Sequence, residues 1–439
     1  MNLSKESFES IFSYNVYKKI VKETAIPHDK KISYEDFKEY ISNLYNALLE
    51  NNYSPKCPRN FLLLNKTKYV SRIIPLLNVE DELFYYFVCK YLEDEIAINR
   101  VQNTFGGWRL GNPLKQQEEE DKILLDYVFG SYNPSMWSEN WKEFTLISAA
   151  FALSGNYSHV IKLDISNFYD SVNLYVLQSK LTKVTPKEKF WAIDYLMYFL
   201  KYWNKKIDDY KPRSVGLPQT EFGDQSRLLA NFYLQDYDCI VREVCEKYGA
   251  EYVRYADDQL IFFNNNNLKE ILLCINLELN KLGLNLNANK TKIISVEELS
   301  QYYLYQPQLL LDRENYNCAT KHFFDIYNQN QEIRYDTFIK RLLSKEIGLD
   351  KLEKSLEMKI KSIIFTENFI MCCNDRTLDR IYLNCSEEEK EHFLNILEHL
   401  REKIIFNSYE YTLLLFYKKH LELTNKYNEL KKELTTVKF

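Results

Sequence analysis

The spacing of apolar and polar residues divides the chain into a helical beginning, a mixed middle and a helical end. Residues 34–45 carry apolar side chains three and four positions apart, as in an amphipathic helix, and residues 1–50 as a whole follow this pattern. From residue 305 onward the spacing again favours helices, and the charged run 386–394 is typical of a solvated helix face. The pattern therefore predicts helical regions at both ends.

Between residues 157 and 300 the pattern alternates between strand and helix. The β-rich runs are residues 159–165, 251–256, 259–263 and 292–296. The helix-period segments are residues 172–202, 223–247 and 267–282. Only Asp257 and Asp258 separate the two central β-rich runs, which is the spacing of a tight hairpin. The predicted fold class is α+β, with an antiparallel sheet in the middle of the chain.

Composition and charge narrow the class of protein. The 439 residues are 46% hydrophobic and include only 10 Gly and 10 Pro, which excludes collagen-like and wholly disordered chains and allows several subdomains. The net charge of −5 by itself argues against a general nucleic-acid binder. However, residues 52–79 contain basic residues and no acidic one, so the net charge conceals a local cationic stretch.

Cysteines and apolar runs indicate the cellular compartment of the protein. The nine Cys form no C-x-x-C pair and sit mostly in apolar runs, which favours free thiols in a reducing compartment over disulfides or zinc. His392 and His399 lack an acidic or Cys partner in register for a metal site. No apolar segment is long enough to span a bilayer, and the N-terminus lacks a signal core. We expect a cytoplasmic protein without a membrane partner.

The candidate chemistry begins with three aspartates. Asp257 and Asp258 meet at the predicted hairpin, where a polar turn is the ordinary interpretation. Asp164 ends the first β-rich run. If that strand lies beside the hairpin, the carboxylates share one sheet edge and form an oxygen-rich site suited to Mg²⁺. Two such ions activate a hydroxyl and stabilise a leaving pyrophosphate.

Two further pieces flank these aspartates in sequence. Residues 216–220, Gly-Leu-Pro-Gln-Thr, form a loop before the long apolar helix expected at 223–247. Residues 282–292 form a turn that brings Lys290 to the start of the last β-rich run. Each piece alone has an ordinary structural interpretation, as a helix start and a connecting turn. Their order along the chain is what suggests a polymerase.

The order of these pieces resembles the palm of reverse transcriptases, including those of group II introns, retrons and bacterial defence systems. The matching motifs are an Asp-ended strand, a Gly-x-Pro-Gln loop with its helix, a Tyr-x-Asp-Asp box and an Asn-x-x-Lys-Thr motif. The resemblance covers residues 60–300 and implies a right-hand polymerase fold with fingers, palm and a helical thumb-like region. The implied parts are an N-terminal helical region (1–55), fingers (56–150), palm (151–300) and a thumb-like C-terminal extension (301–439).

The resemblance also implies roles for individual residues. Asp164, Asp257 and Asp258, with the backbone carbonyl of Ile165, would hold two Mg²⁺ ions, for which Mn²⁺ could substitute. Tyr169 matches the bulky residue that excludes a 2′-hydroxyl, although a core aromatic is the ordinary alternative. The implied nucleotide-binding residues are Lys68, Arg72, Tyr169, Pro218, Gln219 and Lys290. A solvated surface role is the alternative for the lysines, and Asp170 is interpreted as a helix cap.

One part of the sequence departs from the family pattern. Thr220 stands where the family usually has Gly after Pro-Gln, and the segment 221–224 is acidic where small residues are common. Because of this departure, the template base is expected to pack against the loop differently than in the family. The departure does not involve the aspartates.

A narrower resemblance, to the abortive-infection and related defence-associated reverse transcriptases of bacteria, rests on residues 99–109 and 226–238. It implies RNA-directed DNA synthesis from dNTPs in anti-phage defence, in the bacterial cytoplasm. Such relatives pair with a structured non-coding RNA, form homo-oligomers, or prime DNA synthesis from a protein hydroxyl. The alternatives left open are template-independent or protein-primed synthesis, a retron-type enzyme, and an RNA-binding scaffold that acts through its helical tail.

Overall fold

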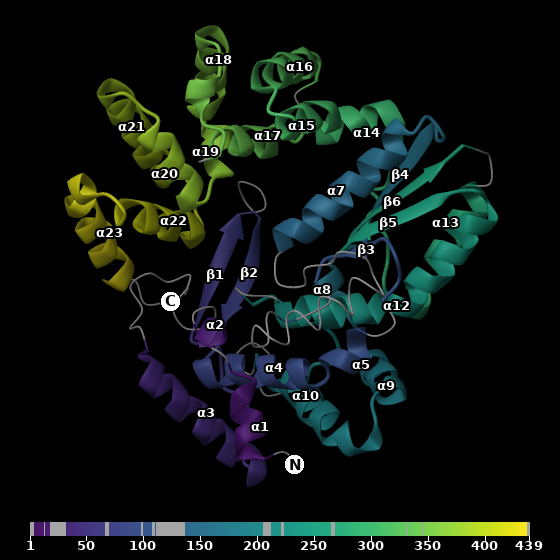
Figure 1. The fold of residues 1–439 in the computed structure, drawn as a ribbon. Helices are drawn as coiled ribbons and strands as arrows, with labels where there is room; N and C mark the ends of the chain where they lie inside the picture. Colours follow the sequence, from purple (N-terminus) through teal and green to yellow (C-terminus); the bar gives the residue numbers. More distant parts are fainter. Residues whose placement is uncertain are drawn as a thin grey trace. The chain divides into compact units, whose positions relative to one another are not determined.

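The computed structural model describes most of the chain in two compact units (Figure 1). The described residues are 4–12, 14–17, 32–65, 70–97, 100–107, 110, 137–204, 212–220, 224–264, 268–330, 332–344 and 346–436. The described residues within 1–24, 30–61 and 74–296 form the first unit, and those within 62–73 and 297–439 form the second. The four parts expected from the sequence stay predictions.

A five-stranded sheet forms the centre of the first unit, in the order β3-β5-β6-β4-β7. Its strands are β3 (Thr104–Phe105), β4 (His159–Asp164), β5 (Glu251–Tyr255), β6 (Asp258–Phe263) and β7 (Lys292–Ser295). Neighbouring strands are antiparallel except for β3, which pairs parallel with β5. The predicted antiparallel sheet is therefore confirmed, and β3 adds a strand that the hydrophobic pattern did not indicate.

The hairpin between β5 and β6 is also confirmed, with its turn shifted by one residue from the prediction. Tyr255 pairs with Asp258, so the turn residues are Ala256 and Asp257 rather than Asp257 and Asp258. Ala256 has φ 52°, the left-handed region that a primed hairpin turn requires. The shift places Asp258 in the sheet and Asp257 in the turn.

Helices pack on both faces of this sheet. Tyr255 lies within ring-contact distance of Trp141 and Phe144 on α7 (Trp137–Leu153), whereas the neighbouring Arg254 reaches Asp238 on α12 (Asp224–Lys247). Consecutive strand residues point to opposite faces, so α7 and α12 cover opposite sides of β5. The hairpin that carries Asp257 and Asp258 is thereby supported from both sides.

The remaining helices of the first unit surround a core of buried aliphatic and aromatic side chains. They are α1 (Lys5–Ser10), α2 (Tyr14–Tyr17), α3 (Tyr34–Leu49), α4 (Val79–Tyr91), α5 (Glu93–Ala97), α8 (Phe168–Ser171), α9 (Leu174–Val184), the 3₁₀ helix η2 (Lys187–Lys189), α10 (Phe190–Tyr202) and α13 (Leu268–Lys281). The single helical segment expected at 172–202 is wrong. Pro186 lacks a backbone N–H and forces Thr185 out of the helical region, so α9 ends before it.

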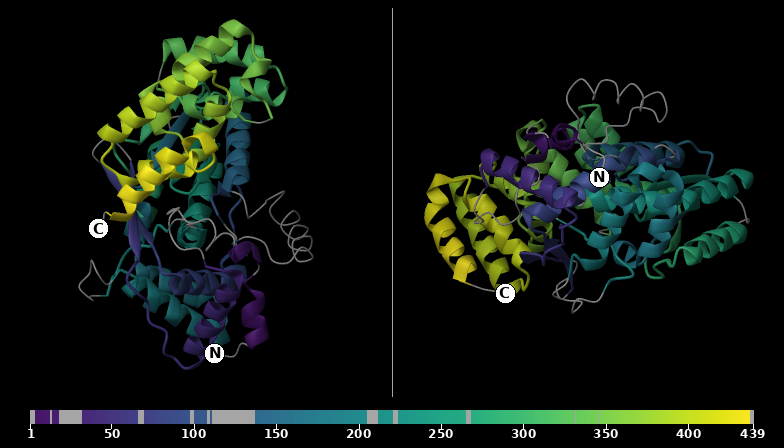
Figure 2. Two further views of the ribbon diagram at one scale, coloured as in Figure 1. Left: turned by 90° about the vertical axis from the view of Figure 1, so that its left-hand side faces the viewer. Right: turned by 90° about the horizontal axis from the view of Figure 1, so that it is seen from below.

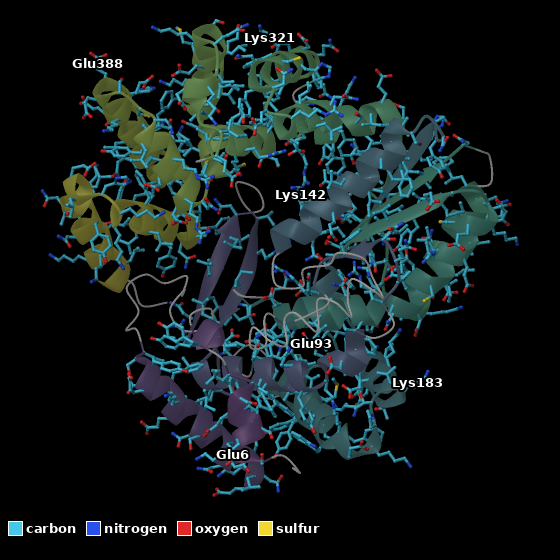
Figure 3. All side chains as sticks on the ribbon, in the orientation of Figure 1. Glu6, Glu93, Lys142, Lys183, Lys321 and Glu388 are labelled. Carbon is cyan, nitrogen blue, oxygen red and sulfur yellow. The ribbon has the colours of Figure 1, made fainter. Side chains whose placement is uncertain are left out.

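The second unit is helical, as predicted, and has its own core (Figure 2, green to yellow). Its helices are α14 (Val296–Tyr303), α15 (Tyr305–Asp312), α16 (Tyr316–Gln329), α17 (Tyr335–Leu342), η3 (Leu349–Lys351), α18 (Lys354–Ile364), α19 (Glu367–Met371), α20 (Asp375–Leu383), α21 (Glu387–Lys403), α22 (Asn407–Tyr417), η4 (Leu421–Leu423) and α23 (Thr424–Thr436). Ser386 and Glu389 form a capping box that begins α21. Glu388 is exposed on that helix, which confirms the predicted solvated face (Figure 3).

A separate two-stranded sheet consists of β1 (Asn60–Asn65) and β2 (Ser71–Leu76). Leu63 N on β1 donates a hydrogen bond to Asn407 Oδ1 at the start of α22, at 2.8 Å. Both strands lie within the cationic stretch found in the sequence, residues 52–79, and Arg72 is on β2. Across the described residues, no helix combines the length and apolar character that crossing a membrane requires.

Candidate active site

The three aspartates predicted from the sequence meet at one edge of the sheet. Strand β4 pairs with β6 so that Asp164, its last residue, lies directly opposite Asp258. Asp257 precedes Asp258 in the hairpin turn. The condition stated from the sequence, that the first Asp-bearing strand lies beside the hairpin, is therefore met. The edge gathers three carboxylates from two strands and one turn.

Asp164 is only 4% exposed and is held by the turn that precedes β7. Lys290 Nζ donates to Asp164 Oδ1 at 2.8 Å, and Asn287 Nδ2 donates to Asp164 Oδ2 at 3.1 Å. The Asn287 backbone N–H also donates to the Asp164 carbonyl at 2.8 Å. Both carboxylate oxygens thus have a donor, which offsets the cost of burying this charge.

Burial and neighbouring charges shift the pKa values of two residues at this edge, Asp257 and Lys290. Burial, together with the charges of Asp258 and Asp164, raises the pKa of Asp257 from 3.8 to about 6. The hydrogen bond to Asp164 raises the pKa of Lys290, so its ammonium form is favoured. Perturbed carboxyl groups of this kind are characteristic of functional sites. A cation beside Asp257 would relieve the repulsion that raises its pKa.

The donor chemistry of this edge fits a hard divalent cation, because all three side chains offer carboxylate oxygens. Among the residues that the structure describes, no group of three His, Cys, Asp or Glu is arranged to hold a metal ion. The oxygens of Asp164 are instead engaged by Lys290 and Asn287. Each oxygen of Asp164 accepts one of these hydrogen bonds and keeps a second lone pair for an ion, and Lys290 would compete with that ion through its positive charge.

The loop at 216–219 lies against the segment that carries Tyr169. Leu217 N donates to the Tyr169 carbonyl at 2.8 Å, and Gly216 N donates to the Val172 carbonyl at 2.8 Å. Gly216 has φ 99°, a backbone conformation that residues with a Cβ rarely adopt, so another residue at this position would strain the loop. The structure brings Tyr169 and the Gly-x-Pro loop together, as the family resemblance requires.

The carbonyl of Pro218 is held by a hydroxyl group that itself contacts a second hydroxyl group. Ser226 Oγ on α12 donates to it at 2.5 Å, and Tyr85 Oη on α4 lies 2.9 Å from the same Ser226 oxygen. Pro218 is buried, whereas Gln219 remains partly exposed. Gln219 is thus a residue of a fixed loop whose side chain retains access to solvent.

Other predicted residues are not brought to this edge by any described contact. Lys68 lies outside the described residues, as do residues 108–109 and 221–223. Arg72 is exposed on β2, and its predicted role stays a prediction. The expectation that Asp170 caps a helix is wrong, because Asn167 occupies the cap position of α8 and Asp170 lies in its first turn.

Sequence reasoning assigned no role to Asn287 or to the residues behind the hairpin. Asn287 opens the Asn-x-x-Lys-Thr motif, and a turn preceding Lys290 was the only available signal. Arg254 lies inside a β-rich run, where a charged residue breaks the apolar pattern, and is fully buried in the structure. A buried charge needs a partner, so this interruption of the pattern was the signal that could have found it.

Comparisons with known proteins identify a related family. The model of the family described as reverse transcriptase (RNA-dependent DNA polymerase) matches residues 115–335, slightly more than half of the chain. A search of curated proteins found no match.

Solved structures similar to this chain include yeast telomerases. Apo telomerase from Candida tropicalis, truncated from its C-terminal domain, has a TM-score of 0.35 at 13% identity and covers 61% of this chain. The chain spans 57% of the length of that protein. Telomerase from Candida albicans, in complex with a fragment of telomeric RNA, has a TM-score of 0.40 at 10% identity, covering 90% of this chain and 70% of its own.

Proposed function

The chain belongs to the reverse transcriptase family, whose members are RNA-directed DNA polymerases, and from this premise we propose that Asp164, Asp257 and Asp258 catalyse DNA synthesis from dNTPs. The observation that carries the proposal is the register of the sheet, which sets Asp164 opposite Asp258 beside the turn that bears Asp257. The reaction is nucleotidyl transfer from a dNTP to a primer hydroxyl on an RNA template.

Divalent ions belong to this proposal. Asp164, Asp257, Asp258 and the carbonyl of Ile165 would hold two Mg²⁺, or Mn²⁺ in their place. When bound, the ions activate the primer hydroxyl and stabilise the leaving pyrophosphate. The raised pKa of Asp257 supports the assignment, because mutual repulsion of the carboxylates favours a bound cation. Asn287 keeps Asp164 oriented at the sheet edge.

The dNTP is selected by residues of the Gly-x-Pro loop and of α8. Tyr169 would lie against the sugar and exclude a 2′-hydroxyl. The hydrogen bond from Leu217 N to the Tyr169 carbonyl supports this role, because it holds the Tyr169 backbone beside the Gly-x-Pro loop. Gln219 would contact the incoming nucleotide from a loop that Pro218 shapes. Ser226 anchors that loop through the Pro218 carbonyl, which limits its movement during binding.

Three basic residues act on the phosphates in this proposal. Lys68 and Arg72 would bind the triphosphate from the cationic stretch. Lys290 would donate a proton to the leaving group, and its raised pKa means that the side chain is in the ammonium form at neutral pH. Its position against Asp164 supports this role, because the side chain is already at the reacting edge.

The biological setting is the finer part of the proposal. Residues 99–109 and 226–238 resemble defence-associated reverse transcriptases, which supports a role in bacterial anti-phage defence. The proposed location is the bacterial cytoplasm, the proposed template is an associated non-coding RNA, and a homo-oligomer is the proposed assembly. The alternative setting is a retron-type enzyme, and the RNA and DNA that co-purify with the protein distinguish the two.

Sequencing the RNA and DNA that co-purify with the full chain tests this setting. We expect one structured RNA and DNA complementary to part of it, and the DNA should be missing from the Asp257→Asn/Asp258→Asn variant. DNA without a complementary RNA would indicate template-independent synthesis. DNA that stays with the denatured protein would indicate priming from a protein hydroxyl.

Phage plaque counts test whether the DNA synthesis serves defence. Cells expressing the wild type should form fewer plaques than cells expressing Asp257→Asn/Asp258→Asn. Equal protection by both proteins would contradict the defence role of the polymerase and would favour a scaffold that acts through its helical tail.

A further inference from the structure

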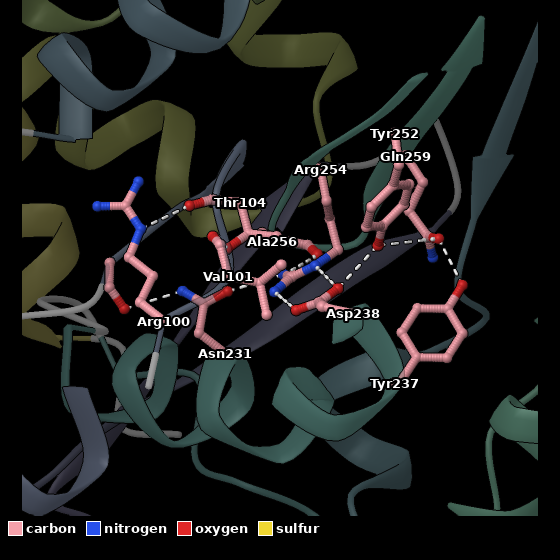
Figure 4. Close-up of polar contacts among 11 residues, drawn as sticks. Arg100, Val101, Thr104, Asn231, Tyr237, Asp238, Tyr252, Arg254, Ala256 and Gln259 are labelled. Atoms are coloured by element: carbon pink, nitrogen blue, oxygen red, sulfur yellow. Dashed lines mark hydrogen bonds and ion pairs between the residues drawn. The ribbon is translucent and has the colours of Figure 1, made fainter. Parts of the chain in front are cut away.

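A buried arginine holds the backbone of the catalytic turn. Arg254 is fully buried on β5, and its Nη1 donates to the Ala256 carbonyl and to Asn231 Oδ1, each at 2.8 Å (Figure 4). Its Nε donates to Asp238 Oδ1 at 2.8 Å and its Nη2 to Asp238 Oδ2 at 2.5 Å. Ala256 directly precedes Asp257, so the arginine acts on the residue that sets the direction of the catalytic turn.

The same network also reaches the residue after the aspartate pair. Tyr252 Oη donates to Asp238 Oδ1 at 2.8 Å, and Tyr237 Oη donates to Gln259 Oε1 at 2.6 Å (Figure 4). Gln259 follows Asp258 on β6 and is fully buried. Hydrogen-bonded groups from α12 therefore fix the chain on both sides of Asp257 and Asp258.

The third support is the segment that contains β3. Phe105 O accepts from Ala256 N at 3.1 Å, and Gly107 O accepts from Asn231 Nδ2 at 2.8 Å. Gly106 has φ 108°, and a Cβ at that position would lie 2.9 Å from Ala256 N. Real side chains do not approach a backbone nitrogen so closely, so only glycine allows this segment to lie against the catalytic turn.

The turn needs this support because its backbone is unfavourable on its own. Ala256 has φ 52°, a left-handed conformation that is unfavourable for a residue with a Cβ. Asp257 and Asp258 are adjacent carboxylates, and repulsion between their like charges favours any movement that separates them. Fixed bonds to the Ala256 N–H and carbonyl oppose both effects.

We propose that Arg254, Asn231 and Gly106 are positioning residues that hold the Ala256 turn so that Asp257 and Asp258 bind divalent cations together. The inference rests on the proposed function of these aspartates. It gives the Thr-Phe-Gly-Gly segment, which the sequence analysis used only as a resemblance, a physical role as the backing of the catalytic turn. None of these residues touches substrate or ion; each acts through the turn.

Two variants with matched controls test the proposal. Gly106→Ala pushes a Cβ against Ala256, whereas Gly155→Ala imposes the same kind of backbone strain, at φ 74°, where no atom lies within 4 Å. Asn231→Ala removes a side chain that bridges two groups behind the turn. Asn264→Ala removes one that bridges Ser158 N and Asn156 O just beyond the opposite end of β6.

The direct measurement is a titration of the full-length protein with Mn²⁺, in which the electron paramagnetic resonance signal of the free ion reports how much Mn²⁺ is bound. Loss of groups that orient metal ligands costs about 10–100-fold in metal affinity, so we expect that weakening in Gly106→Ala and Asn231→Ala. We expect Gly155→Ala and Asn264→Ala to bind like the wild type. In dNTP incorporation, the two test variants should lower kcat and leave KM for dNTP unchanged.

Thermal unfolding followed by tryptophan fluorescence first shows which variants are folded, and if Gly106→Ala does not fold, Asn231→Ala decides. Wild-type Mn²⁺ affinity and kcat in a folded Asn231→Ala protein would overturn the proposal. Equal weakening in the test and control variants would also overturn it, because it would indicate a general loss of stability. A wild type that incorporates no dNTP would instead contradict the proposed function, and the Mn²⁺ titration would still test the positioning role.

Discussion

Replacing Asp257 with Asn should stabilise the metal-free protein at neutral pH while abolishing catalysis. Burial, together with the charges of Asp258 and Asp164, raises the pKa of the Asp257 carboxyl from 3.8 to about 6. The amide of Asn has nearly the same shape but carries no charge. Asp257→Asn therefore removes the repulsion and leaves the geometry of the turn in place.

The size of the effect follows from the pKa. A rise from 3.8 to about 6 corresponds to about 3 kcal/mol of folding free energy lost once Asp257 ionises. The side chain keeps part of its surface in solvent, so screening reduces the expected gain for Asp257→Asn to about 1–3 kcal/mol. Catalytic residues commonly reduce stability in this way.

The sign of the pH dependence is fixed by the same pKa. Between pH 3.8 and about 6 the folded state binds the Asp257 proton more tightly than the unfolded state does. The contribution of the protonated Asp257 carboxyl to the free energy of unfolding is therefore fully present below pH 3.8. It is lost as the pH rises through about 6. The difference in the free energy of unfolding between Asp257→Asn and the wild type should be small near pH 3.8. It should grow between pH 3.8 and about 6 and stay constant at higher pH.

Urea denaturation in the presence of a chelator measures the difference. All five Trp residues lie in the sequence ranges of the first unit, so tryptophan fluorescence reports on the unit that contains Asp257. Asp194→Asn, a change of an exposed carboxylate on α10, should alter stability by less than about 0.5 kcal/mol and serves as the control. Added Mg²⁺ should stabilise the wild type more than Asp257→Asn.

The reasoning would be refuted if Asp257→Asn were no more stable than the wild type at neutral pH. A stability gain that did not change between about pH 4 and pH 7 would refute it equally, because it could not come from ionisation of this carboxyl.

Three further predictions concern other parts of the molecule. Tyr169→Ala should increase rNTP incorporation relative to dNTP, as measured by the ratio of their kcat/KM values, because the ring no longer excludes the 2′-hydroxyl. Lys290→Ala should lower kcat yet leave Mn²⁺ binding equal or tighter, since it frees an oxygen of Asp164. Phe338→Ala, which removes a fully buried ring stacked on Phe323 at 4.6 Å, should destabilise the second unit by about 3–5 kcal/mol in hydrogen-exchange measurements.

The central sheet could be predicted because its signals are local. The strands β4 to β7 have apolar runs of the right length, and two residues between β5 and β6 leave little choice but a hairpin. From these, the meeting of Asp164 with the aspartate pair needed only one assumption about which strands are neighbours. The turn was placed one residue late because a left-handed Ala256 has no local sequence signal.

The supporting network could not be predicted because its signals are not local. Strand β3 has only two residues, and it forms because Thr104 and Phe105 pair with β5, about 150 positions further along the chain. Asp238 lies on one face of a long helix, where a charged residue is ordinarily exposed. Only the fold shows that it faces Arg254 and that the catalytic turn depends on both.

The measurement that tests the central claim most directly is single-dNTP incorporation into a primer annealed to an RNA template, in the presence of Mg²⁺. The account predicts that the wild type and Asp194→Asn extend the primer, and that Asp257→Asn/Asp258→Asn, although folded, gives no extension above background. Equal extension by the wild type and the double variant would contradict the assignment of these aspartates as the catalytic residues.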